Sequence, residues 1–322
     1  MKIVRVVKEW DFPDIMRQTP NADGIWNNIQ FTTESIKEFD FLLVLNYPNE
    51  NLNVRCYGGG KFIFIQEPPV ERYQWFNDSI KYFDRAYSPS FNKVEGLGTE
   101  LVLSQPALPW HINKSYSELI DLESEGLKKQ NKVSWITSNK AFLPGHQVRL
   151  EFLKNLQQSG FQFDLFGRGF RELDDKFKGL ESYKYSIAFE NHYCNNYWTE
   201  KIADCYLSWT MPIYYGCTNI YKFFPSESMI KINPEDFNDS LRTIKEAISQ
   251  RTWDSNLEYI SEARELILKK YQIFPYIESI IESGIVTSGK KKNFYIPKSS
   301  WPNNRTSQEN VLAKIMRKIK SW

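Results

Sequence analysis

The residues that offer the most chemistry lie between positions 185 and 216, in the sequence YSIAFENHYCNNYWTEKIADCYLSWTMPIYYG. An apolar run there ends in Phe189–Asn191, and after a polar loop a helix is predicted to begin at Thr199, whose hydroxyl suits an N-cap. The first N–H groups of a helix attract anions, whereas a cation such as Lys201 is poorly placed there. A bound diphosphate would remove that conflict. An ordinary strand–loop–helix unit with a solvated Glu200–Lys201 pair explains the spacing equally well.

A second segment that could bind phosphate is residues 138–156, SNKAFLPGHQVRLEFLKNL. Its apolar residues recur at helical spacing, which predicts a helix that carries Arg149 near its start. The planar guanidinium group of arginine can contact phosphate oxygens in two places. By itself, a surface arginine paired with Glu151 is the simpler interpretation. His146 could approach the same anion, and Arg168, between two glycines after a predicted strand, is a weaker candidate of the same kind.

Short apolar runs separated by mixed segments predict alternating strands and helices in both halves of the chain, which is typical of α/β domains with parallel sheets. In the first half, strands are predicted at 2–7, 39–47, 61–66 and 83–87, with mixed segments long enough for helices at 34–38 and 70–82. In the second half, strands are predicted at 133–137, 161–166, 185–189, 212–215 and 229–232, with helices at 146–158, 199–209 and 258–283.

The length of 322 residues and the hydrophobic content of 41% indicate a globular protein of two domains. The charged segment 121–132 marks the boundary, which gives an N-terminal domain at 1–125 and a C-terminal domain at 132–285. No apolar run approaches the length of about 18 residues that a membrane span requires. Because the start of the chain lacks a signal-peptide core and the four cysteines form no CxxC pair, we expect a cytoplasmic protein.

The net charge of +2 hides two oppositely charged regions. Residues 290–322 hold nine Lys or Arg and one Glu, a local charge of +8, so the other residues sum to −6. Within the segment 286–322, the residues from 307 onward predict a basic amphipathic helix that ends in Trp322. We expect this tail to bind an anionic membrane surface, although packing on the body or on a partner chain would explain the same pattern. The sequence has no RNA-recognition motif, which disfavours nucleic acid as a partner.

Three motifs in order resemble the signature of the glycosyltransferase family 10 α1,3-fucosyltransferases. They are Phe-Glu-Asn at 189–191, Tyr-Trp-Thr-Glu-Lys at 197–201 and Pro-Ile-Tyr-Tyr-Gly at 212–216. Trp198 replaces the usual valine, and His192 stands where serine is common, but neither difference removes a charged group. The resemblance implies a GT-B fold, in which two Rossmann-like domains face each other across a cleft. It also implies that the N-terminal domain binds the acceptor and the C-terminal domain binds GDP-fucose.

The resemblance also implies roles for individual residues of the C-terminal domain. Glu200 would bind sugar or ribose hydroxyls, and Lys201 would face the diphosphate, where negative charge develops as GDP leaves. Glu190 is a weaker candidate in the same motif. The donor-binding residues that the resemblance implies are Arg149, Asn191, Tyr197, Glu200 and Lys201.

An inverting transferase needs a carboxylate beside the acceptor hydroxyl to remove its proton. Glu67 directly follows the predicted strand at 61–66, and two prolines after it stiffen the chain. A carboxylate at the carboxyl end of a parallel strand points into the crevice between domains. Glu67 is therefore the predicted catalytic base and Glu71 its nearest rival, while a turn-capping or surface role remains the alternative for Glu67.

These inferences together predict an inverting α1,3-fucosyltransferase that moves fucose from GDP-fucose to a GlcNAc-containing glycan at the inner face of the cytoplasmic membrane. The sequence has no D-x-D motif and no Cys/His spacing typical of zinc, so no metal or other cofactor is expected. A transferase that uses another GDP-sugar is the alternative within the same class. A non-catalytic glycan- or membrane-binding protein on the same scaffold is the alternative from another class.

Overall fold

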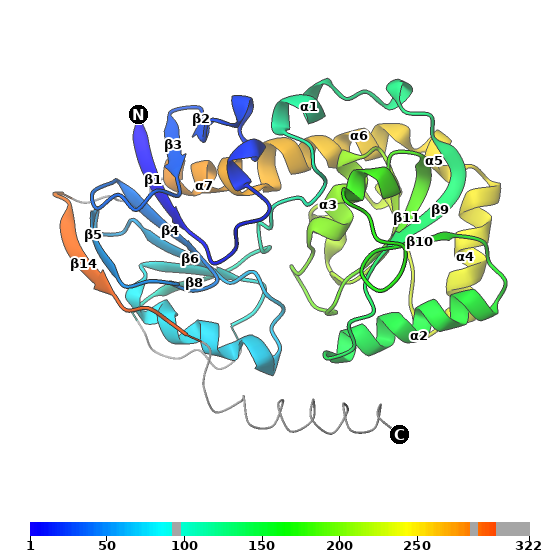
Figure 1. Cartoon of the computed structure of the whole chain (residues 1–322), viewed down its shortest axis with the longest axis horizontal. Helices are drawn as coiled ribbons and strands as arrows, with labels where there is room; N and C mark the ends of the chain where they lie inside the picture. The colour runs from blue at the N-terminus through cyan, green and yellow to red at the C-terminus, as the bar shows by residue number, and fades with distance from the viewer. Residues whose placement is uncertain (92–97, 284–288, 301–322) are drawn as a thin grey trace.

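Two sheets, one in each half of the chain, form the framework of the computed structural model, which describes residues 1–91, 98–283 and 289–300 (Figure 1). The N-terminal sheet has the order β2-β3-β1-β4-β6-β7-β8, and only β2 runs antiparallel to its neighbour. Its strands are β1 (Lys2–Val7), β2 (Ile25–Trp26), β3 (Ile29–Thr32), β4 (Phe41–Leu45), β6 (Lys61–Phe64), β7 (Arg85–Ser88) and β8 (Glu100–Leu103).

The C-terminal sheet is parallel throughout and has the order β10-β9-β11-β12-β13. Its strands are β9 (Gln130–Ile136), β10 (Asp164–Phe166), β11 (Tyr183–Phe189), β12 (Met211–Tyr215) and β13 (Ile230–Lys231). The helices are α1 (Tyr116–Asp121), α2 (Pro144–Gln158), α3 (Glu200–Leu207), α4 (Phe237–Ser249), α5 (Thr252–Ser255), α6 (Leu257–Leu266) and α7 (Ile273–Glu282). The strands predicted in both halves are confirmed, with ends that differ by a few residues.

The central strand β4 shows why the N-terminal sheet is apolar on both faces. Every residue of its sequence FLLVL is buried, and alternate side chains point to opposite faces. Phe41 and Leu43 belong to a core that includes Phe274 and Ile277 of α7, whereas Leu42 belongs to a second core on the other face. The N-terminal sheet, whose strand β6 leads to Glu67, is therefore covered by other elements on both faces.

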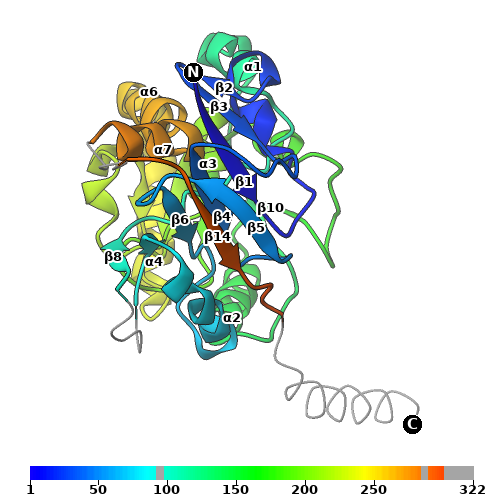
Figure 2. The same cartoon turned by 90° about the vertical axis from the view of Figure 1, so that its left-hand side faces the viewer.

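The face opposite α7 is covered by a 3₁₀-helix, η3 (Glu71–Tyr82), and by the strand pair β5 (Leu52–Cys56) and β14 (Lys292–Ile296). β14 pairs antiparallel with β5, with Phe294 opposite Val54 (Figure 2). The sequence predicts that α7 lies in the C-terminal domain and that β14 lies in the tail. The structure instead packs both against the N-terminal sheet, because their apolar residues complete its two cores.

Three segments that the sequence favours as helices differ in the structure. The helix predicted over 258–283 divides into α6, a π-helical turn (Ile267–Tyr271) and α7, because Gln272 is extended, with ψ 163°. The break lets one stretch of chain serve both domains, α6 in the C-terminal half and α7 in the N-terminal half (Figure 1). The segment 34–38 forms no helix, and the segment 70–82 forms the 3₁₀-helix η3 instead of an α-helix.

The predicted membrane-binding helix from residue 307 onward lies outside the described residues. Within the part that the structure describes, no helix has the length and apolar character needed to cross a bilayer. The last described segment, which ends at residue 300, still contacts the N-terminal half. The backbone N–H of Ser299 donates a 2.9 Å hydrogen bond to the carbonyl of Pro48.

Candidate active site

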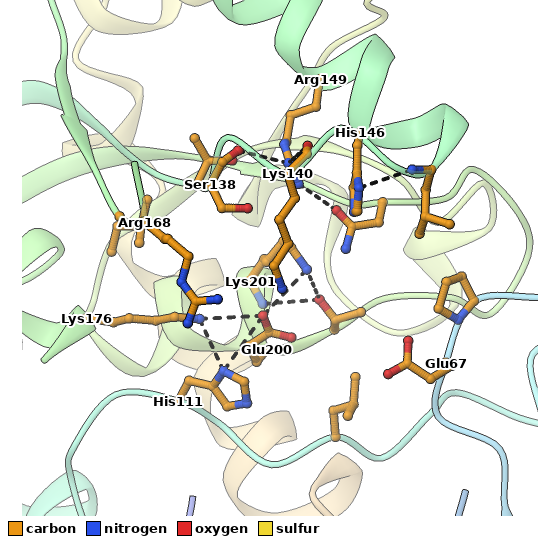
Figure 3. A pocket seen from close by; sticks show the side chains of 18 of the residues that line it. Glu67, His111, Ser138, Lys140, His146, Arg149, Arg168, Lys176, Glu200 and Lys201 are labelled. Atoms are coloured by element: carbon orange, nitrogen blue, oxygen red, sulfur yellow. Dashed lines mark hydrogen bonds and ion pairs between the residues drawn. The ribbon is translucent and has the colours of Figure 1, made fainter. Parts of the chain in front are cut away.

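A cavity of about 670 Å³ lies between the two halves and is lined by both of them. Its polar walls follow β6, β9, β10 and β11 at their carboxyl ends, which is where open parallel sheets bind ligands. Figure 3 shows Glu67 on one side and Arg168 and Lys176 on the other, with Arg149 above and Glu200 between them. The predicted site residues that line the cavity are Glu67, His146, Arg149, Arg168, Asn191, Tyr197, Glu200 and Lys201.

The lining carries more positive than negative charge. Its basic side chains are Lys140, Arg149, Arg168, Lys176 and Lys201. Its acidic side chains are Glu67, Glu172 and Glu200. A body with a net negative charge therefore gathers cations in this cavity, which favours an anionic ligand.

Arg149 is the most buried of these cations, with 3% of its surface exposed. Its Nη1 donates to Oδ1 of Asn191 at 2.7 Å, and its Nη2 donates to the carbonyls of Ser138 and Lys140 at 3.0 and 3.1 Å. Its buried Nε has no hydrogen-bond partner in the described structure. Burial lowers the pKa of Arg149 to about 10, so the side chain stays charged at neutral pH. A buried cation held only by neutral oxygens favours an anion beside it.

The start of α2 brings Arg149 to this position. Pro144 occupies the first turn of the helix, where its missing N–H costs no hydrogen bond. The next residue, Gly145, packs on the backbone of the Phe-Glu-Asn motif, because a Cβ there would lie 1.9 Å from the carbonyl oxygen of Asn191. Glycine thus permits the close approach that places Arg149, one turn later, against the Asn191 side chain.

His146 shares this buried, positive environment. Burial lowers its pKa to about 4, and the nearby cations Arg149, Lys140 and Lys201 act in the same direction. Its Nδ1 accepts a 3.4 Å hydrogen bond from the backbone N–H of Leu143. His146 is therefore a neutral imidazole at neutral pH and adds no charge to the site.

The start of α3 is tied to Glu190, a fully buried carboxylate. Oε1 of Glu190 accepts from the backbone N–H of Thr199 at 2.8 Å, and its Oε2 accepts from the Thr199 hydroxyl at 2.7 Å. Thr199 is the N-cap, as predicted, and its hydroxyl accepts from the N–H of Lys201. The N–H groups of Thr199 and Lys201 therefore already have partners within the protein, and neither is available to an anion at the start of this helix.

Lys201 projects from this anchored turn into the cavity. Its Nζ lies 3.3 Å from Oε2 of Glu190, 3.0 Å from the Thr199 hydroxyl and 3.5 Å from Oε1 of Glu200. Burial alone would lower the pKa of Lys201, but the two carboxylates outweigh it and raise the pKa above its usual value. Glu190 does not itself line the cavity. Its carboxylate instead holds Lys201 charged and in place from behind.

The glycine that closes the third motif supports the same arrangement. Gly216 has φ +154°, and a Cβ at this position would lie 2.3 Å from Cγ of Glu190. The position therefore leaves no space for a side chain. The glycine of the Pro-Ile-Tyr-Tyr-Gly motif thus permits Glu190 to reach the start of α3.

Glu200 contacts two residues that sequence reasoning does not identify. Its Oε1 lies 3.5 Å from Nζ of Lys176 and 3.9 Å from Nδ1 of His111. Burial opposes ionisation of Glu200, but the charges of Lys201 and Lys176 outweigh it, and the pKa of Glu200 lies well below its usual value. Glu200 is therefore a carboxylate at neutral pH, able to accept hydrogen bonds from hydroxyl groups.

His111, from the N-terminal half of the chain, also lines the cavity. Its backbone N–H donates at 2.8 Å to Asp204 of α3, and its ring nitrogen lies 3.3 Å from Nζ of Lys176. Burial lowers the pKa of its imidazole to about 4. No sequence motif marks His111 or Lys176, since only tertiary folding brings them to Glu200.

Tyr197 is buried beside the same carboxylates. Burial raises the pKa of its hydroxyl well above 10, and the neighbouring Glu190 and Glu67 raise it further. The phenol therefore stays neutral and lines the cavity. A neutral hydroxyl group can donate a hydrogen bond to a ligand oxygen.

Glu67 lies on the N-terminal side of the cavity, as predicted. Burial, with a smaller contribution from Glu9, raises its pKa to about 7, although Lys201 opposes the shift. The Tyr73 hydroxyl donates a hydrogen bond to it. Its rival Glu71 is exposed on η3 and does not line the cavity. A carboxylate that titrates near neutral pH and faces a cavity has the properties of a general base.

A solved structure defines the fold class to which this site belongs. An α-glucosyltransferase in complex with UDP-glucose and DNA containing an abasic site matches with a TM-score of 0.56 and 11% identity. The match covers 87% of this chain and 99% of that chain. The two sheets and the cavity between them therefore have the GT-B fold of glycosyltransferases.

The C-terminal half matches a known protein family. Residues 127–256 match the family described as glycosyltransferase family 10 (fucosyltransferase) C-term. This range contains the signature motifs and every cavity residue discussed above except those of the N-terminal half and His111. This part of the chain is therefore similar to the C-terminal domain of glycosyltransferase family 10.

Two curated relatives match part of the chain. "GDP-fucose protein O-fucosyltransferase 3" of Danio rerio is 26% identical over 151 residues, which are 44% of this chain and 32% of that protein. "Alpha-(1,3)-fucosyltransferase FucT" of Helicobacter pylori is 28% identical over 116 residues, which are 33% of this chain and 24% of that protein. The chain thus matches about a third or less of the length of these relatives.

Proposed function

We propose that this protein transfers fucose from GDP-fucose to a hydroxyl of a glycan, with inversion at the anomeric carbon. The observation that supports this most is one cavity with two chemically different walls. The C-terminal wall holds Arg149 and Lys201, and the N-terminal wall holds Glu67. The first wall suits a diphosphate leaving group, and the second suits an attacking hydroxyl.

The donor half of the reaction needs positive charge where the bond breaks. When the bond between the fucose C1 and the β-phosphate oxygen breaks, its electron pair stays on GDP. Arg149 and Lys201 are already desolvated and held by neighbouring groups, so they can stabilise that charge with little reorganisation. Glu200, kept ionised by Lys176 and Lys201, accepts hydrogen bonds from sugar or ribose hydroxyls.

The acceptor half needs a base. The acceptor hydroxyl oxygen forms its new bond to C1 on the face opposite the departing diphosphate, and its proton passes to the Glu67 carboxylate. The products are the fucosylated glycan, GDP and protonated Glu67, which releases its proton to solvent. Because the pKa of Glu67 is about 7, roughly half of the enzyme holds the base form at pH 7.

The proposed donor sugar and linkage rest on the family and on the motifs. Both relatives named above are fucosyltransferases by name, and one is an α1,3-fucosyltransferase. We therefore propose GDP-fucose as donor, a GlcNAc-containing glycan as acceptor and an α1,3 linkage.

We also propose that transfer needs no metal or other cofactor, because Arg149 and Lys201 balance the charge of the diphosphate. A chelator should therefore leave transfer unchanged. Metal-dependent transfer would contradict that part.

Release of GDP from a panel of GDP-sugars, with and without a glycan acceptor, tests the proposal. We expect acceptor-dependent release from GDP-fucose and a product whose anomeric configuration is inverted, as read by NMR. Preferential release from another GDP-sugar would replace fucose as the transferred sugar. Saturable glycan binding without any GDP binding in calorimetry would instead favour a non-catalytic binding protein.

A further inference from the structure

The segment 104–115, between β8 and α1, connects the two walls of the active site. Near its start, the carbonyl of Pro106 accepts a 3.0 Å hydrogen bond from the side chain of Gln66, the residue before the proposed base. Further along, the backbone N–H of His111 donates at 2.8 Å to the carboxylate of Asp204 on α3. The segment therefore runs along the cavity from the N-terminal wall to the C-terminal wall.

By the proposed function, the transferred sugar occupies the space beside this segment. Its anomeric carbon is bonded to the diphosphate on the C-terminal wall and is attacked by the hydroxyl on the N-terminal wall, so the sugar must lie between the two walls. Leu108 and His111 of the segment line the cavity there. Figure 3 shows the His111 ring next to Glu200 and across the cavity from Arg149.

The two nitrogens of the His111 ring have different roles. Nδ1 lies 3.3 Å from Nζ of Lys176. A lysine ammonium group donates hydrogen bonds and cannot accept them, so Nδ1 is the accepting nitrogen and carries no proton. Burial lowers the pKa of His111 to about 4 in spite of the nearby Glu200, which leaves the ring neutral at neutral pH. A neutral imidazole holds a single N–H, and that N–H is therefore on Nε2.

This N–H is available to a ligand. Among the residues that the structure describes, none makes a hydrogen bond with Nε2 of His111, and the atom is not buried. Lys176, which fixes the tautomer, lies 3.5 Å from a carboxylate oxygen of Glu200 and 3.5 Å from one of Asp204. The ring thus presents one hydrogen-bond donor to the cavity from a held position.

We infer that His111 donates this hydrogen bond to a hydroxyl of the transferred sugar and is a specificity-determining residue for the donor. Glu200 beside it can only accept hydrogen bonds, so the two side chains together complement a sugar that presents hydroxyls to both. This inference rests on the proposed function. It adds a sugar contact from the N-terminal half of the chain, outside the three motifs of the C-terminal half.

The neutral state of the ring suits a position beside the transferred sugar. Positive charge develops on the sugar ring in the transition state of glycosyl transfer. An imidazolium group there would repel that charge, whereas a neutral N–H can bind a hydroxyl without doing so. The charge of Lys176, on the other side of the imidazole, disfavours protonation of His111 and helps to keep it neutral.

The ribose of the nucleotide is the competing source of a hydroxyl for His111. The ribose is separated from the acceptor by the diphosphate and the transferred sugar. The segment that carries His111 instead continues to Gln66, directly beside the base. This continuity favours the transferred sugar over the ribose.

A pair of substitutions at His111 tests the inference. His111→Leu removes the donor and should lower kcat/KM for GDP-fucose about 3- to 10-fold, the range for one neutral hydrogen bond. GDP affinity in calorimetry should stay within about twofold, which also shows that the variant is folded. His111→Gln can place an N–H near the position of Nε2 and should recover most of the loss. Ser117→Ala, exposed on α1, is the control.

Analogues of GDP-fucose that lack one hydroxyl, the 2-, 3- and 4-deoxy sugars, identify the partner of His111. With the analogue that lacks the partner hydroxyl, His111→Leu and the native enzyme should have equal kcat/KM, and the loss should persist with the other two. The same loss with all three analogues, an unchanged kcat/KM in His111→Leu, or equal weakening of GDP and GDP-fucose would overturn the inference and leave the transferase proposal standing. A protein that neither binds GDP nor consumes GDP-fucose would overturn the proposed function, and the inference with it.

Discussion

The two walls of the active site are built in different ways. The C-terminal wall consists of charged groups that are fixed by other groups, such as Arg149 by Asn191 and Lys201 by Glu190. The N-terminal wall presents Glu67, whose pKa is raised to about 7 mainly because burial disfavours its charge. One wall is arranged to stay charged, and the other is arranged to change its charge.

This difference matches what each half of the proposed reaction demands. A leaving diphosphate keeps its negative charge, so the groups that face it should not titrate near neutral pH. A base must gain and lose a proton in every turnover, so its pKa should lie near the working pH. Variants on opposite walls should therefore fail in different ways, and the following experiments test whether they do.

The largest expected effect is at Glu67. Glu67→Gln keeps the size of the side chain but removes the base, and we expect kcat to fall by about 10³-fold. GDP affinity, measured by calorimetry, should change little because the donor wall is intact. Glu71→Gln, an exposed substitution outside the cavity, is the matched control. Full activity in Glu67→Gln would show that another group takes the proton.

Arg149 should show the opposite pattern. Arg149→Ala removes a buried cation, and the loss of charged hydrogen bonds to phosphate, about 1.5–3 kcal/mol, predicts a decrease in GDP affinity of about 10- to 100-fold. Arg149→Lys should recover only part of it, since an ammonium group cannot reproduce the planar fork. Lys154→Ala on the exposed face of α2 is the control. Unchanged GDP affinity in Arg149→Ala would show that Arg149 does not bind the diphosphate.

The same contrast explains what could be predicted from sequence. Glu190, Thr199 and Lys201 lie within eleven residues of one another, so local spacing alone indicates that they act together. Glu67 could be predicted from sequence because it directly follows an apolar strand. His111 and Lys176 reach Glu200 from distant parts of the chain, and no local pattern marks them.

Long-range packing also decided the elements that sequence patterns placed wrongly. Gln272 ends one helix so that α7 can cover the N-terminal sheet, although the apolar pattern continues across it. β14 has basic neighbours that predict a tail, but its pairing with β5 is decided by a partner far away in sequence. Periodicity predicts which face of an element is apolar, but not which sheet will cover it.

A smaller effect is expected on the pH dependence of transfer. With the pKa of Glu67 at about 7, kcat/KM should fall about tenfold for each pH unit well below 7. Glu9, whose Oε1 accepts from Asn46 at 2.8 Å, adds a negative charge that raises this pKa, while Lys201 opposes it and Glu200 adds to it. Glu9→Gln should therefore move the acid limb to lower pH. An acid limb at the same pH in Glu9→Gln and the native enzyme would show that Glu9 does not influence the pKa of the base.

The pKa of Glu67 also has a consequence for stability, with a defined sign. Its raised folded-state pKa means that the folded protein binds more protons than the unfolded chain between about pH 4.5 and 7. Its contribution to the free energy of unfolding therefore decreases as pH rises through that window. Glu67→Gln removes this loss, so its melting temperature relative to the native enzyme should be higher at pH 8 than at pH 5. A difference that does not depend on pH would contradict the assigned pKa.

The smallest effect on transfer is expected from removal of the basic tail, which we propose holds the enzyme at the anionic inner face of the cytoplasmic membrane. The structure decides where to cut, because β14 at 292–296 pairs with β5. Deletion of 301–322 removes five basic residues and leaves that pair intact. At about 1 kcal/mol for each basic residue near the surface, binding to anionic vesicles should fall sharply.

Transfer to a soluble acceptor should stay within about twofold, because the active-site residues all precede the cut. Deletion from 290 onward, which also removes β14, should lower the melting temperature. Equal vesicle binding by the 301–322 deletion and the full chain would show that membrane affinity, if present, belongs to the body.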